Sequence, residues 1–563
     1  MPGINPNRPD YTSPVPKYKY AETLKEQETE LKSDPFILRF IKSRESMADD
    51  PFRPLYHFVS PESTLNDPNG LCFWQGLWHM FYQGYPPEDR NQHWGHAFSK
   101  DLIHWKDLPY AIYPNPERSC FSGSTLVEEN RVIAIYHGVE AGTMIATSSD
   151  PLLLNWDKLT GEPVIPTSRP LKSASDQDII DGQALFEYWS KQVTRNQPRP
   201  AKLPYRVFDP CIWKKGDFYY SLSAGTLPHK PTGKRTRANF LFRSKDMITW
   251  EYLHPFIEGD RFTLLGDDGA CPYFWPIGDR NILLFFSHMS GGQALLGDYD
   301  QERDKFVVSS HHPFNFGAYG PGGVHAPSAT PDGKGGVIVI FNMNPAFETE
   351  GWDQIMSLPR RLSLKGEDNI ARDSLNVEPA GAVESLRSEQ KQIDNVLLPA
   401  NREVVLAGIE GNAMEIMAEI DVGDSPMVEM NVLRSPNRNE FTRIAFYRGR
   451  GYRDWERYTG WDKASRLAAS DSLISIDSSY SSTLPGALSR APETGSVFLA
   501  PDEPLKLRVF VDRSVVEVFV NGRQCIAMRV YPGLRDSIGV SMRSQGQDAK
   551  IRRLNAWQMK SIY

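Results

Sequence analysis

The sequence predicts an all-β protein, with a five-bladed β-propeller followed by a C-terminal β-sandwich. The first observation is a weak repeat, in which a turn of Gly, Asn or Asp leads into a strand of apolar and aromatic residues. Five segments have this form: 76–82, 130–136, 216–220, 278–286 and 335–341. Strand-rich units that recur along a chain are typical of propellers, with one unit in each blade. A run of hairpins in a sandwich is the alternative, but sandwiches do not need repeated units of this length.

Two further observations support this fold. A Ser/Asp element that ends in Trp follows three of the repeated strands, at 99–105, 148–156 and 244–250. Near the C-terminus, apolar strands are expected at 505–511 and 515–520, and Asn521-Gly522 is a strong hairpin signal before a further strand at 525–530. These hairpins predict a second β-rich domain after the propeller.

The expected domains follow in chain order. A chain of 563 residues is long enough for more than one core. We expect an N-terminal extension at 1–53, the propeller at 54–364, a linker at 365–402 and the sandwich at 403–563. The extension should be partly helical, because its second half is charged and helix-prone apart from Asp34-Pro35. The linker is expected to contain a helix at about 379–398.

Charge and composition exclude several kinds of partner. The formal net charge of −7 is small, and Lys/Arg runs are absent, so we expect no nucleic-acid partner. No apolar run approaches the ~20 residues that span a bilayer, so we expect no membrane partner. The first residues lack the apolar segment of a secretory signal, and five widely spaced cysteines fit free thiols in a reducing compartment. We therefore expect a cytoplasmic protein with no metal or other cofactor, and the sequence leaves its oligomeric state open.

Residues 64–70 (TLNDPNG) are the stretch around which chemistry could be organised. Asp-Pro-Asn-Gly is ordinary turn chemistry, because Pro fixes φ and Asn-Gly tolerates positive φ. Aromatic strands and residues 93–97 (HWGHA) follow it closely. An acidic residue on a rigid turn, with amide and aromatic groups nearby, suits a carboxylate nucleophile that faces a sugar ring. Asp67 is therefore a candidate nucleophile, and a purely structural turn is the alternative.

Polar candidates also lie near the start of the other four units. They are found in residues 120–124 (CFSGS), 205–213 (YRVFDPCIW), 265–274 (LGDDGACPYF) and 322–328 (GGVHAPS). Propellers place functional groups on their innermost strands, near the central channel. The regular phasing of these motifs therefore predicts that their side chains line one funnel, among them His325 from the fifth unit.

From about residue 55 onward, these motifs closely resemble those of glycoside hydrolase family 32, which contains the invertases, inulinases and levanases. The resemblance implies a retaining glycosidase acting on β-fructofuranosides or a related furanoside, with a small carbohydrate or oligosaccharide as its substrate. It implies that Asp67 is the nucleophile and Asp209 the transition-state stabiliser. The substrate-binding positions that it implies are Asn66, Gln83, Trp94, Phe121 and Ser122. The C-terminal residues 512–519 resemble the family's sandwich domain and are expected to be structural or at a domain interface.

Two departures from the family pattern concern substrate binding. The Arg that precedes the stabilising Asp in the family is Phe208 in this sequence, although Arg206 lies two residues earlier. Thr64 and Leu65 stand where the family usually has Trp and Met or a similar pair. Phe208 and Arg206 are kept as candidate binding residues of a divergent pocket.

The third departure concerns the proton donor. The acid/base Glu of the family's Glu-Cys motif is Ala270 here, and a methyl group cannot donate a proton. Ala270 is either an engineered replacement or natural, and in the second case Asp267 or Asp268 is the nearest acid, unless both lie on a solvated turn. Two functions follow: a retaining glycosidase, or a non-hydrolytic sugar-binding protein that keeps the pocket. The sugar, the linkage, exo or endo action, and hydrolysis versus transfer stay open.

Overall fold

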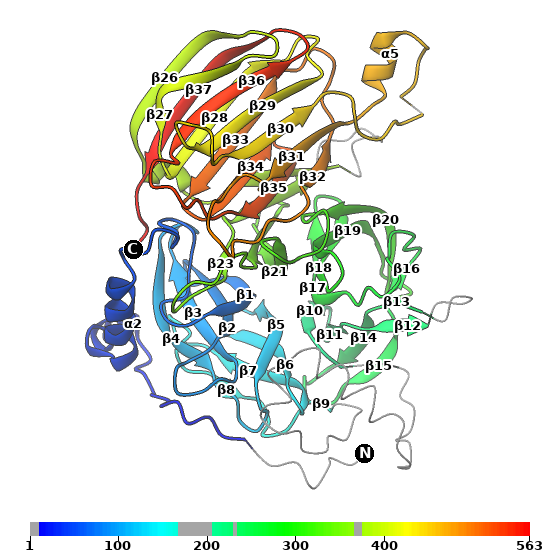
Figure 1. Ribbon diagram of the computed structural model, residues 1–563. Coiled ribbons are helices and arrows are strands. Elements are labelled where there is room, and N and C mark those ends of the chain that lie inside the picture. The colour runs from blue at the N-terminus through cyan, green and yellow to red at the C-terminus, as the bar shows by residue number, and fades with distance from the viewer. Residues whose placement is uncertain (1–10, 167–204, 206, 229–233, 365–373, 456) are drawn as a thin grey trace.

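The computed structural model describes residues 11–166, 205, 207–228, 234–364, 374–455 and 457–563, and it confirms the predicted fold class. Five mainly antiparallel sheets form a ring. Two six-stranded sheets follow in the chain and pack as a sandwich above the ring (Figure 1). Each sheet of the ring is built from strands that are neighbours in the sequence, because short turns connect successive strands of a blade. The fold therefore consists of a propeller and a sandwich.

The strands of the propeller have the following bounds. Blade 1 contains β1 (Leu65–Trp74), β2 (Leu77–Gly84), β3 (His93–Ser99) and β4 (Trp105–Ile112). Blade 2 contains β5 (Cys120–Val127), β6 (Val132–Gly138), β7 (Gly142–Ser148), β8 (Asp157–Lys158) and β9 (Ile165–Pro166). Blade 3 contains β10 (Pro210–Lys215), β11 (Phe218–Ser223), β14 (Phe240–Ser244) and β15 (Glu251–Pro255), with the small hairpin β12 (Thr226–Pro228) and β13 (Arg235–Arg237) beside it. Blade 4 contains β16 (Ile257–Glu258), β17 (Ala270–Ile277), β18 (Arg280–Ser287), β19 (Gly291–Asp300) and β20 (Lys305–Pro313). Blade 5 contains β21 (Val324–Pro331), β22 (Val337–Met343), β23 (Ile355–Met356), β24 (Arg360–Leu364) and β25 (Leu375–Pro379).

The innermost strands of the ring are β1, β5, β10, β17 and β21. Each contacts the innermost strands of its two neighbouring blades, and β21 contacts β1, so the ring is closed. The pairing of four of these strands is interrupted near its start, at Leu65/Pro68 and Asn69/Cys72, Cys120/Gly123, Ala270/Tyr273 and Val324/Pro327. Such bulges bend a strand and re-aim the side chains beside them. The interruptions coincide with the motifs that the sequence analysis placed around the funnel.

The sandwich packs two sheets face to face around a core of Val, Ile, Leu and Met side chains. One sheet has the order β26 (Arg387–Leu398), β37 (Ala549–Met559), β28 (Ala413–Asp421), β33 (Leu505–Asp512), β34 (Val515–Val520) and β35 (Gln524–Arg529). The other has the order β27 (Glu403–Glu410), β36 (Gly539–Gln545), β29 (Met427–Arg434), β30 (Thr442–Tyr447), β31 (Ser472–Asp477) and β32 (Glu493–Val497). The short helix α5 (Lys463–Ala468) lies on an excursion from this sheet (Figure 1).

The expected helix of the linker, at about 379–398, is wrong. This region contains one short 3₁₀ turn, η2 (Val383–Leu386), and then the twelve-residue edge strand β26. Most of the β26 side chains are exposed or half-buried and polar, because edge strands of sheets are commonly protected by charge. That polar composition is also typical of a solvated helix, which explains the error.

The N-terminal extension is partly helical, as its sequence predicts, with α1 (Leu24–Glu30), η1 (Leu31–Ser33) and α2 (Pro35–Ser46). Asp34 caps α2 by accepting hydrogen bonds from the amides of Phe36 and Ile37. Phe36 and Phe40 pack edge-on against Tyr110 of blade 1, so α2 lies on the outside of that blade (Figure 1). No helix within the described residues is long and apolar enough to span a membrane.

A buried polar seam joins the chain before blade 1 to the sandwich. The backbone amides of residues 55–57 all donate to the Asp512 carboxylate, which lies at the end of β33. The His57 ring lies between Asp512 and Glu517, at 2.9 and 3.1 Å, and Glu517 also binds Arg360 of blade 5 at 2.7 Å. The hydrogen bonds from His57 to these two carboxylates outweigh the effect of burial and raise the pKa of His57 to about 9. Asp512 and Glu517 therefore form an interface between the domains.

Candidate active site

The two predicted carboxylates approach each other at the inner ends of β1 and β10. Asp67 is supplied by the irregular first part of β1, and Asp209 directly precedes β10 with a φ of 37°. This left-handed conformation is strained for a residue other than Gly, and such strain is often found at functional sites. The Sγ atom of Cys271 lies 3.5 Å from Asp67 Oδ2 and 3.6 Å from Asp209 Oδ2, so one thiol bridges the two carboxylates.

Asp67 is held by side chains from four strands. Ser122 Oγ donates to Asp67 Oδ2 at 2.5 Å, and Gln83 Nε2 donates to the same oxygen at 3.2 Å. The His325 ring nitrogen Nδ1 lies 3.1 Å from Oδ1. Burial alone would raise the pKa of Asp67, but the hydrogen bond and charge of His325, together with the bonds from Ser122 and Cys271, hold the pKa below its usual value. Asp67 is therefore kept ionised.

Asp209 has the opposite environment. Its carboxylate accepts a hydrogen bond from the Cys271 amide at 3.3 Å, and the residue before it is Phe208 rather than a cation. Burial first, and then the negative charge of Asp67, raise the pKa of Asp209 to about 7. The site thus contains two buried carboxylates whose pKa values are separated by their surroundings, and such perturbed groups cluster at functional sites.

Ala270 and Cys271 lie in the bulge of β17. The Ala270 methyl is 0% exposed, in an apolar cluster with Phe286 and Ala326 on which Phe208 also packs. All five cysteines of the chain are buried and free, and Cys271 is the one that contacts the carboxylates. Burial and the two neighbouring carboxylates raise the pKa of the Cys271 thiol well above its usual value, so it stays neutral and serves as a weak donor.

The two acids before Ala270 have separate partners. Asp267 is buried and forms an ion pair with Arg237, which also binds Asp260 at 2.8 Å. Asp268 is half-buried, and its Oδ2 lies 2.7 Å from Nδ1 of His288, a residue that directly follows β18.

His288 and Cys271 are the site residues that the sequence analysis did not assign. Cys271 could have been assigned from its position beside Ala270, whereas His288 carries no signal beyond its place after a predicted strand.

The remaining predicted binding residues lie in different surroundings. Asn66 accepts a hydrogen bond from Asn342 at 3.1 Å, and Asn342 also contacts His325 at 3.1 Å, so both belong to the surroundings of Asp67. Phe121 and Phe208 are half-buried near the same inner strand ends. Arg206 lies outside the described residues. Trp94 does not line the funnel as expected: it is 0% exposed, and its indole N–H donates to the Phe121 carbonyl, because its ring fills the core between blades 1 and 2.

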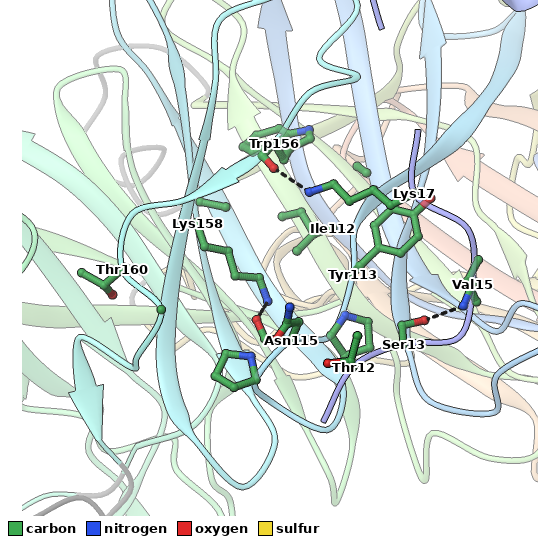
Figure 2. A pocket seen from close by; sticks show the side chains of 15 residues that line it. Thr12, Ser13, Val15, Lys17, Ile112, Tyr113, Asn115, Trp156, Lys158 and Thr160 are labelled. Carbon is green, nitrogen blue, oxygen red and sulfur yellow. Dashed lines mark hydrogen bonds between the residues drawn. The ribbon is translucent and has the colours of Figure 1, made fainter. Parts of the chain in front are cut away.

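Two hollows lie elsewhere on the molecule. One, of about 420 Å³, lies between the N-terminal extension and blades 1 and 2, where Lys17 reaches the Trp156 carbonyl and Lys158 reaches that of Asn115 (Figure 2). The other, of about 680 Å³, lies beside Thr64, Trp352 and sandwich residue Leu488. Neither is lined by Asp67 or Asp209.

Within the described residues, no group of three His, Cys, Asp or Glu side chains could hold a metal ion.

Two buried carboxylates at the inner strand ends of a five-bladed propeller are consistent with a glycoside-cleaving enzyme, and the comparisons with known proteins agree with this class. The model of the glycosyl hydrolases family 32 N-terminal domain matches residues 57–187 and 172–379, and that of the family 32 C-terminal domain matches residues 382–558. The chain belongs to glycosyl hydrolase family 32.

Three similar proteins illustrate the family. A levanase of Bacillus subtilis is 27% identical over 92% of this chain and 72% of its own length. A sucrose-6-phosphate hydrolase of Vibrio alginolyticus is 26% identical over 85% of this chain and 86% of its own length. The crystal structure of fructan 1-exohydrolase IIa from Cichorium intybus shares the fold, with a TM-score of 0.71 and 21% identity over 91% of this chain and 98% of that one.

Proposed function

We propose that this protein is a retaining glycoside hydrolase that acts on β-fructofuranosides, with Asp67 as its nucleophile. The observation that carries the proposal is the pair Asp67 and Asp209, both buried, bridged by one thiol and differing in pKa. Bringing two carboxylates together has an electrostatic cost that a simple binding pocket need not incur. The names of the relatives, a levanase and a sucrose-6-phosphate hydrolase, support a fructoside as the substrate.

The proposed reaction has two steps. Asp67 attacks the anomeric carbon, the bond to the leaving group breaks, and a fructosyl ester forms on Asp67; water then cleaves this ester with net retention. Ser122 and Gln83 bind Oδ2 and orient the carboxylate, while ionised Asp209 stabilises the positive charge that develops on the sugar ring. Ala270 supplies no proton to either step.

The experiment is hydrolysis of sucrose, levan and inulin-type oligosaccharides by the protein and by Asp67→Asn. We expect fructose release by the unchanged protein and a loss of roughly 10⁴-fold in kcat for Asp67→Asn, because an amide cannot act as the nucleophile. Asp107→Asn, at an acid on the outside of blade 1 that pairs with Arg44, is the control for an unspecific effect of charge removal on activity. Equal activity of Asp67→Asn and the unchanged protein would refute the assignment.

A second candidate function is carbohydrate binding without hydrolysis. Ala270 and Phe208 favour it, because both replace a group with which the family binds or protonates its substrate. If no furanoside is hydrolysed but fructose oligosaccharides bind, and Asp209→Asn weakens the binding measured by calorimetry, the second function replaces the first.

A further inference from the structure

Proton donation to the leaving group needs a source that Ala270 cannot provide. A donor on this branch must lie near the same strand end, must face the two carboxylates and must have a protonated nitrogen or oxygen open to substrate. Asp267 does not satisfy the last condition, because it is buried in an ion pair with Arg237. Cys271 is buried between the carboxylates and has a raised pKa, so its thiol is a poor donor.

We propose that His288, positioned by Asp268, is the general acid and base that takes the place of the missing glutamate. The two residues are brought together by the β17–β18 hairpin, in which Ala270 pairs with Phe286. Asp268 lies two residues before Ala270, just ahead of β17, and His288 lies two residues after Phe286, just after β18. His288 therefore lies two residues further along the hairpin than Phe286, the residue that pairs with Ala270.

The ring contacts connect His288 with the nucleophile. The Phe286 ring lies 4.7 Å from the His288 ring and 3.9 Å from the His325 ring, centroid to centroid, and His325 contacts Asp67. Phe286 also belongs to the apolar cluster that covers Ala270. Phe286 thus lies between two imidazoles: His325 contacts Asp67, and His288 is exposed to solvent.

The hydrogen bonding of His288 suits proton transfer. Its Nδ1 lies 2.7 Å from Asp268 Oδ2, which fixes the tautomer and stabilises the imidazolium, while Nε2 has no hydrogen-bond partner among the described residues. The His288 side chain is 60% exposed and that of Asp268 is 22% exposed, so a substrate can reach Nε2 while the pair stays ordered. This is the arrangement of a histidine oriented by a carboxylate.

The charged groups around His288 favour its protonated form. They are Asp268 before β17, Asp209 before β10 and Asp67 in β1, with His325 of β21 behind Phe286. Although burial alone would lower it, the bond to Asp268 and the three carboxylates raise the pKa of His288 above its usual value. In the same way, His288 opposes the rise in the pKa of Asp209.

In this inference, which rests on the proposed hydrolysis, His288 transfers one proton in each of the two steps. As the glycosidic C–O bond breaks and the Asp67–sugar C–O bond forms, Nε2–H of His288 gives its proton to the leaving oxygen. Neutral His288 then takes a proton from water, whose oxygen attacks the anomeric carbon and releases Asp67 as a carboxylate. His288 ends protonated, as it began.

The test compares His288→Gln and Asp268→Asn with the unchanged protein on sucrose and on an aryl β-fructofuranoside with a good leaving group. We expect His288→Gln to lose roughly 10²–10⁴-fold in kcat/KM on sucrose and much less in the first step on the aryl substrate, which needs little protonation. Added azide, which attacks the fructosyl ester without a base, should restore turnover of the aryl substrate by His288→Gln and yield a fructosyl azide. Asp268→Asn should retain activity but shift the basic limb of the pH profile to lower pH, because His288 loses the carboxylate that keeps it protonated.

The matched control is His104→Gln. His104 forms the same kind of pair, with Nδ1 2.8 Å from Asp101 Oδ2 and a side chain 44% exposed, but on a turn between β3 and β4. The His104→Gln substitution should leave the rates and the pH profile unchanged. Activity of the unchanged protein together with full activity of His288→Gln on sucrose would overturn the inference, as would azide rescue of Asp209→Asn alone, which would assign the proton to Asp209. Absence of any activity in the unchanged protein would instead refute the proposed function.

Discussion

Ala270 illustrates how one side chain changes what the rest of the site must supply. Its methyl is covered by Phe286 and neighbouring apolar groups, and Phe208 packs on the same cluster, so aromatic rings occupy the surroundings that a longer side chain would need. Interiors are close-packed, and a buried carboxylate without a partner is expensive. A natural alanine at this position requires a proton donor elsewhere in the site.

Ala270→Glu is expected not to raise hydrolysis of sucrose, and to lower the free energy of unfolding by about 2 kcal/mol or more, because the carboxylate would be forced into an apolar cluster. Thermal unfolding and initial rates measure the two effects. Ala270→Gln has nearly the same volume without an acid and is the control. A rise of roughly 10²-fold for Ala270→Glu alone would show that a missing glutamate had been restored.

For single residues, the sequence was enough to predict that Asp67, Asp209 and Ala270 belong to one site, because each lies in a short local motif. It could not assign His288, since the pair with Asp268 forms only when β17 and β18 adopt their register across 20 residues of chain. Nor could it foresee that Trp94 fills the core between blades, because burial of an aromatic ring depends on the neighbouring blade.

The inner strands are the elements that turn these residues into a site. Local turn and aromatic patterns were enough to predict five blades, because each hairpin is formed by neighbouring residues. The edge strand β26 was expected to be a helix, because its charged residues carry no period that a partner strand would reveal. The residues at the start of the inner strands set the local charge, and Phe208 just before β10 is an example.

Phe208→Arg should shift the pH dependence of hydrolysis. Asp209 has a pKa of about 7 and acts in its ionised form, so kcat/KM of the unchanged protein should rise as pH increases through about 7. A guanidinium beside Asp209 favours its ionised form. The acidic limb of the pH profile should therefore move to lower pH by roughly 1–3 pH units.

The pH profile of kcat/KM on sucrose measures this shift, with Phe208→Gln as the control for size without charge. An acidic limb that stays in place in Phe208→Arg, although the protein is folded and active, would show that another group sets it.

For the whole molecule, the sandwich and the propeller depend on the seam around His57. His57, Glu517 and Arg360 are all fully buried; His57 lies between Asp512 and Glu517, and Glu517 binds Arg360 and accepts the Leu358 amide. Removing one member leaves an uncompensated buried charge, which is strongly destabilising.

Glu517→Gln should therefore lower the free energy of unfolding by roughly 3–5 kcal/mol. The contribution of His57, whose pKa rises from 6.5 to about 9 on folding, is complete below pH 6.5 and is lost as the pH rises through 9. Because Glu517 has its pKa lowered from 4.5 to about 2, its contribution is complete above pH 4.5 and is lost as the pH falls toward 2.

Urea unfolding at several pH values measures both limbs. Glu251→Gln, which removes an exposed pair with Arg243, should leave the unfolding midpoint almost unchanged. A Glu517→Gln protein with unaltered stability between pH 5 and pH 8 would contradict the role of the seam.

The seam also has a consequence for the order of events during synthesis. The blades are made one after another, and each can form its own hairpins as it leaves the ribosome. His57 and Asp512, however, are 455 positions apart, and the segment before blade 1 binds blade 5 through Met356 as well as the sandwich. β21 contacts β1, but the seam that joins the segment before β1 to the sandwich forms only after β33 and β34 have emerged, and β1 carries Asp67. A ribosome-bound chain that ends before residue 505 therefore contains all five blades but is expected to lack a stable catalytic centre.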